Sequence, residues 1–173
     1  RLAALEQTME RADEATRAAD DGIARGEAIF EDYPDRADAR RALAAILLTK
    51  GDIEDSVENR NDALLLRIRA AVVLQSLEPA ANIGPQSTSL LARAIRGAAR
   101  LYAEQGDFGA ARPLCRESLE LESRAAQSAP ADRQIRRSLA DSLMLEADIL
   151  DWEGKLDDAE AAYRQALLAA TQL

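Results

Sequence analysis

The chain has 173 residues, of which 47% are apolar, so it is long enough and apolar enough to form a packed core. Aromatic residues make up only 3%, while alanine and leucine recur throughout, which favours helices packed on helices through small and aliphatic side chains. The formal charge of −9 argues against nucleic acid or an anionic membrane surface as a partner, and it leaves basic and neutral proteins open.

The residue types of most catalytic and metal centres are scarce. There is no histidine, the commonest general base near neutral pH, and Cys115 is the only cysteine. No glycine-rich phosphate loop or nucleophile elbow is present, and the pair Asp157-Asp158 fits the start of a helix better than acid–base chemistry. We therefore expect no enzyme activity, no metal and no cofactor. The longest apolar run, 42–48, is too short to cross a bilayer, so we expect a soluble protein without membrane insertion, cytoplasmic or, as the alternative, periplasmic.

Residues 1–33 begin at Arg1 without an initiator methionine, and we expect the chain to be part of a longer protein. Ala15 lies 48 residues before Ala63, a spacing that recurs later in the chain. We interpret this segment as a truncated repeat, with the tail of one helix followed by a second, complete helix. Gly22 and Gly26 are expected to weaken that second helix.

Three blocks follow in register at a period of 48 residues, at 34–81, 82–129 and 130–173. The period is marked by Ala63, Ala111 and Ala159 and by Leu43-Ala44, Leu91-Ala92 and Leu139-Ala140. Within each block the apolar residues recur at helical spacing. Each block therefore predicts two amphipathic helices joined by a turn.

Glycine marks the turn between the paired helices in two blocks, at Gly106 and Gly154, because glycine adopts the left-handed conformation that ends a helix. In the first block we expect an asparagine of the segment 58–62 to take that role. Pro113 lies inside the second helix of the middle block, where it is expected to kink the helix or delay its start. The longest loop is expected at 79–85, which has a proline at each end.

The last block resembles the tetratricopeptide repeat. The family's small residue of the first helix, its glycine before the second helix and its small–aromatic–small series match Ala147, Gly154, Ala159, Tyr163 and Ala166. The middle block matches with Ala99, Tyr102, Gly106, Ala111, Cys115 and Ser118, and the first block with Gly51, Ala63, Arg67 and Ala70, where Arg67 replaces the usual aromatic. The resemblance covers about residues 35–173, with a period longer than the usual 34 or so. It implies an all-α, right-handed superhelical solenoid of antiparallel helix pairs, and long-period versions resemble repeats fused to bacterial kinases and transcriptional regulators.

In the resembled family the first helix of each pair lines a concave groove. The resemblance implies that the middle block contributes a stripe of three arginines to this groove, and that the first and third blocks contribute acidic residues on either side of it. The implied groove comprises Arg93, Arg96, Arg100, Asp52, Asp141, Met144, Asp148 and Trp152. One interpretation is that the arginines bind an anionic peptide segment. The other is that they form interhelical ion pairs, such as Arg100 with Asp52 and Asp148. At the level of Arg96 the neighbouring first helices carry Leu48 and Met144, and neither is acidic. Reversing the charge of Arg96 is therefore expected to leave folding almost unchanged.

These patterns predict a protein–protein interaction module that holds a peptide or helix of a partner. The alternatives are a structural or self-association scaffold, with a homodimer formed through the last helix, and a sensor region of a larger bacterial signalling protein. Trp152 is either a binding contact or a partly buried contact with the following helix. Cys115, at a core position of the repeat, is expected to be an inert buried thiol.

Overall fold

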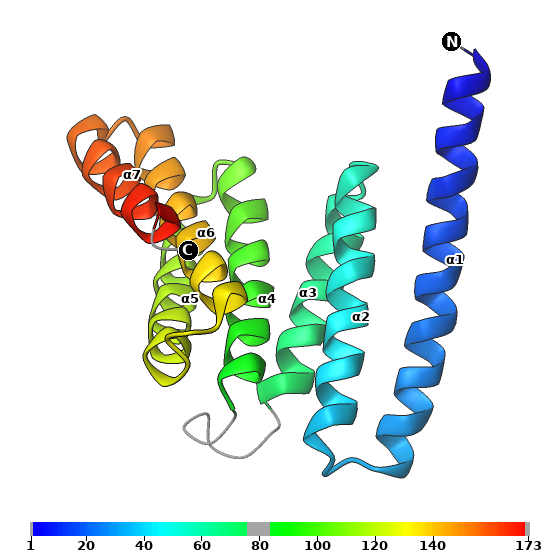
Figure 1. The fold of residues 1–173 in the computed structure, drawn as a ribbon. Coiled ribbons are helices and arrows are strands. Elements are labelled where there is room, and N and C mark those ends of the chain that lie inside the picture. The colour runs from blue at the N-terminus through cyan, green and yellow to red at the C-terminus, as the bar shows by residue number, and fades with distance from the viewer. Residues whose placement is uncertain (1, 76–83, 172–173) are drawn as a thin grey trace. The chain divides into compact units, whose positions relative to one another are not determined.

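The computed structural model describes residues 2–75 and 84–171, with side chains from residue 13 onward. All regular structure in these ranges is helical, which confirms the all-α expectation (Figure 1). The helices are α1 (Leu2–Asp32), α2 (Ala37–Ser56), α3 (Arg60–Gln75), α4 (Pro85–Glu104), α5 (Phe108–Ser128), α6 (Arg133–Trp152) and α7 (Leu156–Thr171). The expected loop at 79–85 lies largely outside the described residues, and its last residue, Pro85, is the first of α4.

The chain divides into two compact units, Arg1–Leu77 with helices α1 to α3 and Glu78–Leu173 with helices α4 to α7. Each of the three predicted blocks contains the two helices that the period indicates, α2 with α3, α4 with α5, and α6 with α7. The periodic alanines are the buried contacts between paired helices: Ala63 and Ala111 are 0% exposed and Ala159 is 2% exposed. The small residue at this position lets the two backbones approach each other.

We expected the tail of one helix followed by a second helix in the first 33 residues. The structure has one continuous helix of 31 residues there, α1. Gly22 and Gly26 lower helix propensity, yet they serve the packing of α1 on α2. A Cβ atom at Gly26 would lie 3.1 Å from Cδ1 of Leu43, and one at Gly22 would lie 3.3 Å from Cγ2 of Ile46. The two glycines therefore allow a close approach that a larger residue would obstruct.

The turns inside the three helix pairs share one backbone geometry. Their positive-φ residues are Glu58 (63°), Gly106 (79°) and Gly154 (75°), each 48 residues from the next. In each turn the following amide donates to the carbonyl five residues back: Asn59 to Glu54 at 2.8 Å, Asp107 to Tyr102 at 2.9 Å and Lys155 to Leu150 at 2.9 Å. This is the 6→1 hydrogen bond of the Schellman motif. The expectation of a left-handed asparagine in the first block was wrong, because the conformation follows the register and falls on Glu58.

We expect Glu58→Gly to raise the free energy of unfolding by about 1 kcal/mol. A side chain with a Cβ is strained in the left-handed region, and a carboxylate beside the C-terminus of α2 is unfavourable to the helix dipole. Asn59→Gly is the matched control, because Asn59 is not at positive φ. Its side-chain Nδ2 donates to the carboxylates of Glu54 at 3.0 Å and Asp62 at 2.7 Å, and glycine would lose both hydrogen bonds. Urea denaturation should show stabilisation for the first substitution and destabilisation for the second. Equal changes for both would refute the strain argument.

In the second unit, α4, α5 and α6 pack together through the buried cluster Ala99, Ala103, Ala111, Cys115, Leu145 and Ile149. The side chain of Asp107 caps α5 by accepting from the Ala110 amide at 3.0 Å. Pro113 lies within α5 but does not delay its start, because the helix already begins at Phe108. Pro113 is the sixth residue of α5, beyond the first turn, so it removes the N–H that would otherwise donate to the Gly109 carbonyl.

Candidate functional site

Arg96 joins α4 to α6 inside the second unit. Its Nη1 donates to the Ser138 carbonyl at 2.6 Å, to the Ser138 hydroxyl at 3.2 Å and to the Ser142 hydroxyl at 3.1 Å. Its Nη2 lies 3.6 Å from an Asp141 carboxylate oxygen, and the arginine side chain is only 15% exposed. Arg96 thus has an acidic partner, Asp141, at the level of Arg93, so the reason for expecting its reversal to leave folding unchanged does not hold.

A buried carboxylate lies beside this arginine. Glu122 of α5 is 0% exposed, and its Oε1 accepts from the hydroxyl of Ser89 on α4 at 3.2 Å and from that of Ser138 on α6. Its Oε2 is also buried and has no hydrogen-bond partner. Burial raises the pKa of Glu122 to about 7, although the two hydroxyl groups and Arg96 favour the charged form.

Sequence reasoning missed Glu122, but the period contained a signal for it. One period earlier stands Leu74, which is fully buried. A glutamate at a buried leucine position of a repeat must find polar partners or stay protonated. Here Ser89, Ser138 and Arg96 surround it, so three helices of the unit meet at one polar cluster.

Two of the predicted acidic groove residues instead join the helices of their own pair. Asp52 of α2 accepts from Arg67 of α3 at 3.1 Å, and Asp55 accepts from the same guanidinium at 3.3 Å. Two helix pairs further on, which is two periods, the same relation recurs: Asp148 accepts from the Tyr163 hydroxyl at 2.7 Å. That carboxylate raises the pKa of Tyr163 to about 12.

The other two arginines of the stripe, Arg93 and Arg100, also have contacts. Arg100 pairs with Glu104 one turn along α4 at 2.7 Å, and its side chain is 39% exposed. Arg93 is half-buried and has an interaction of its own within the structure. These contacts favour the interpretation of the stripe as internal polar contacts.

One face of α6 remains accessible. We call it the α6 face, and it comprises Asp141, Met144, Asp148, Asp151 and Trp152, which follow one another at helical spacing. Met144 is 44% exposed and Trp152 is 47% exposed, so each presents about half of an apolar side chain to solvent. The Asp141 side chain is 56% exposed, and Asp151 is exposed as well. The face therefore combines apolar surface with carboxylates, which suits an amphipathic, basic segment.

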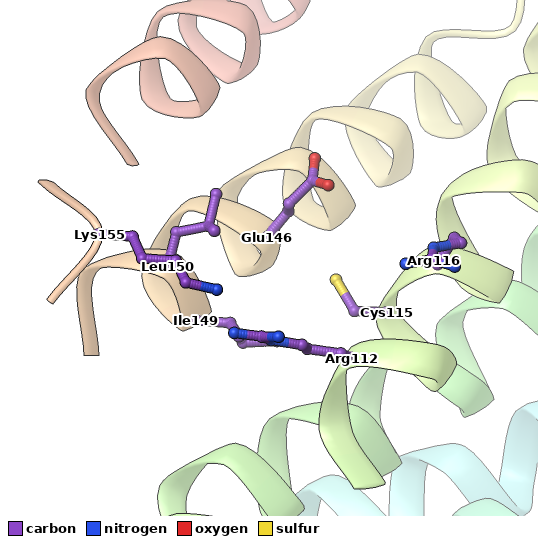
Figure 2. A pocket seen from close by; sticks show the side chains of 7 residues that line it. All are labelled: Arg112, Cys115, Arg116, Glu146, Ile149, Leu150 and Lys155. Atoms are coloured by element: carbon purple, nitrogen blue, oxygen red, sulfur yellow. The ribbon is translucent and has the colours of Figure 1, made fainter. Parts of the chain in front are cut away.

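A cavity of about 210 Å³ lies between α5 and α6, away from these residues (Figure 2). It is lined by Arg112, Cys115, Arg116, Glu146, Ile149, Leu150 and Lys155. Arg112 and Lys155 both pair with Glu153, so much of the positive charge at its rim is balanced. Cys115 is 3% exposed, which confirms a buried thiol, and burial together with Glu146 raises its pKa to about 12. A thiol with such a pKa stays protonated at neutral pH and is a poor nucleophile.

No group of three metal-ligating side chains occurs among the residues that the structure describes. Within the same ranges, no helix combines the length and the apolar character that crossing a bilayer requires.

The comparisons with known proteins reach only the fold. No protein-family model matches the chain, and no curated protein matches it in sequence. Among solved structures it is similar to the crystal structure of BtubC (BKLC) from P. vanneervenii, with a TM-score of 0.60 and 18% sequence identity. The match covers 94% of this chain and 58% of that chain, so this chain spans a little over half of the other's length. At this level of identity the likeness shows a shared all-helical fold.

Proposed function

We propose that this chain is a protein–protein interaction module of tetratricopeptide type, and that the α6 face receives a basic amphipathic peptide or helix of a partner protein. The observation that carries the proposal is the pair of half-exposed apolar side chains, Met144 and Trp152, among carboxylates on one helix. Exposed tryptophan and methionine are enriched where proteins bind one another. The chain's formal charge of −9 favours a basic partner in addition.

An anionic partner held by the arginine stripe is less well supported. Arg96 is committed to Ser138, Ser142 and Asp141, and displacing it would cost those contacts. The resemblance to long-period repeats of bacterial signalling proteins supports a setting in which the module is the sensor or scaffold region of a larger cytoplasmic protein. In that setting the module would bring a partner to the neighbouring domains and carry out no reaction itself.

The proposal is tested with two labelled amphipathic peptides that share a leucine face and carry either lysine or glutamate on the other. We expect fluorescence anisotropy to show binding of the lysine peptide, and tighter binding than for the glutamate peptide, because the α6 face is acidic. Trp152→Ala should weaken that binding at least about tenfold, as expected for a central aromatic contact. Since Trp152 is the only tryptophan, its emission should also shift on binding.

Tyr33→Ala is the matched control, because Tyr33 is an aromatic residue of similar exposure, 54%, on the first unit. It should leave the affinity for the lysine peptide unchanged. Equal affinity for both peptides, or no effect of Trp152→Ala, would remove the α6 face as the binding surface.

A further inference from the structure

The last helix carries an exposed face whose two leucines correspond to partly buried side chains in the preceding pair. We call it the α7 face, and it comprises Leu156, Glu160, Tyr163, Arg164 and Leu167. Leu156 is 65% exposed and Leu167 is 63% exposed. With Asp151 and Ala159 these residues line a surface depression of about 340 Å³ on the second unit. α7 packs beside α6 (Figure 1), which leaves its other side open.

The internal repeat shows what such a face does. One period earlier, Leu156 and Leu167 correspond to Phe108 and Leu119 of α5. Those two side chains are partly buried against the cluster that contains Leu145 and Ile149 of α6. The two leucines of the α7 face therefore stand where the preceding pair has side chains packed on a core, and at α7 no described residue covers them.

The order of residues along this face is self-complementary. From the N-terminal end it reads leucine, glutamate, arginine, leucine, at 156, 160, 164 and 167. If a second copy of α7 is laid antiparallel across it, Leu156 faces Leu167 of that copy and Glu160 faces Arg164 of that copy. A two-fold axis repeats both contacts, so each copy gains two apolar and two opposite-charge contacts.

The charged side chains at the centre are available for this contact. The Glu160 and Arg164 carboxylate and guanidinium groups are 2.5 Å apart within one helix, and their side chains are 64% and 73% exposed. Such an exposed pair contributes little within a single helix. In the antiparallel arrangement the same two groups would join a cluster of four alternating charges, shielded at both ends by leucines.

We infer that the chain forms a two-fold symmetric homodimer in which two antiparallel copies of α7 pack through the α7 face. This dimer does not involve the arginine stripe, and it stands whether or not the α6 face binds a basic peptide. The occupant of the depression is then the leucine of a second copy.

Charge reversal tests the arrangement directly. Sedimentation equilibrium of the wild-type chain should show a monomer–dimer equilibrium. Glu160→Arg and Arg164→Glu should each weaken dimerisation at least about tenfold, because each places like charges opposite one another across the axis. The double variant, with both substitutions, should dimerise like the wild type. An equimolar mixture of the two single variants should also dimerise, because each then faces the opposite charge.

Circular dichroism should show all variants equally helical, since both side chains are exposed. A wild-type chain that remains monomeric at about 1 mM, the weakest affinity of practical interest, would overturn the inference. A wild-type dimer whose affinity neither single charge reversal lowers would also overturn the inference, because that dimer must form through another surface. A dimer that the single reversals weaken, and that neither the double variant nor the mixture restores, would overturn the antiparallel register.

Discussion

Arg96→Glu is expected to lower the free energy of unfolding by about 3–5 kcal/mol. The substitution removes three hydrogen bonds to Ser138 and Ser142 and places a carboxylate next to Asp141 and near the buried Glu122. Removing one partner of a largely buried charged contact leaves the others uncompensated. Because domains are stable by only about 5–15 kcal/mol, much of the second unit's stability would be lost. Urea denaturation followed by circular dichroism measures the change.

Arg100→Glu is the internal comparison for this prediction. It removes the same charge from the same helix, but the Arg100 side chain is 39% exposed and pairs with Glu104 across one helical turn. Such pairs contribute less than about 1 kcal/mol. If the two variants unfolded at the same urea concentration, the contacts of Arg96 with α6 would contribute no more to the free energy of unfolding than the exposed pair of Arg100 with Glu104.

Between about pH 4.5 and pH 7 we expect the wild-type chain to lose about 3 kcal/mol of stability through Glu122 alone. Burial raises the folded-state pKa of this carboxyl to about 7 from 4.5, so the folded chain binds more protons than the unfolded chain in that interval. Stability therefore falls as pH rises through the window and is fully present below it. Arg96 and the hydroxyls of Ser89 and Ser138 oppose this effect, and Asp141 adds to it.

The measurement is the difference in unfolding free energy between the wild type and Glu122→Gln, taken at pH 4.5 and at pH 8. The glutamine variant cannot ionise, so it should gain about 3 kcal/mol relative to the wild type between the two pH values. Glu120→Gln, an exposed position two residues earlier on α5, controls for the other carboxylates and should show no such gain. A difference that does not change with pH would show that Glu122 titrates normally in the folded state.

The helix pairs were predictable because their signals are periodic. Close packing of the paired helices requires a small residue at Ala111 and Ala159, and the left-handed turn favours glycine at Gly106 and Gly154. Both requirements can therefore be recognised in the sequence from the residue type. Glu58 shows the limit of that reasoning: its backbone conformation is set by the hydrogen bonds of the turn, and residue preference pointed to a neighbouring asparagine instead.

The polar contacts were less predictable. Helical spacing places three arginines on one face, but it does not say how far a guanidinium reaches or which acceptor it meets. For Arg96 the shortest hydrogen bond is to a backbone carbonyl, that of Ser138, and no sequence pattern marks such an acceptor. Glu122 was recoverable in principle from Leu74, whereas its serine partners come from two other helices and become neighbours only in the folded unit.

The equivalence of Arg67 and Tyr163 bears on how such repeats diverge. In both cases a side chain on the second helix donates a hydrogen bond to an aspartate at the same place on the first, Asp52 or Asp148. What the two pairs share is a donor within reach of a carboxylate, although a guanidinium and a phenol differ in charge and shape. The middle pair has Arg100 and Cys115 at these two places, so the contact links the helices of the first and third pairs while the middle pair is joined by other residues.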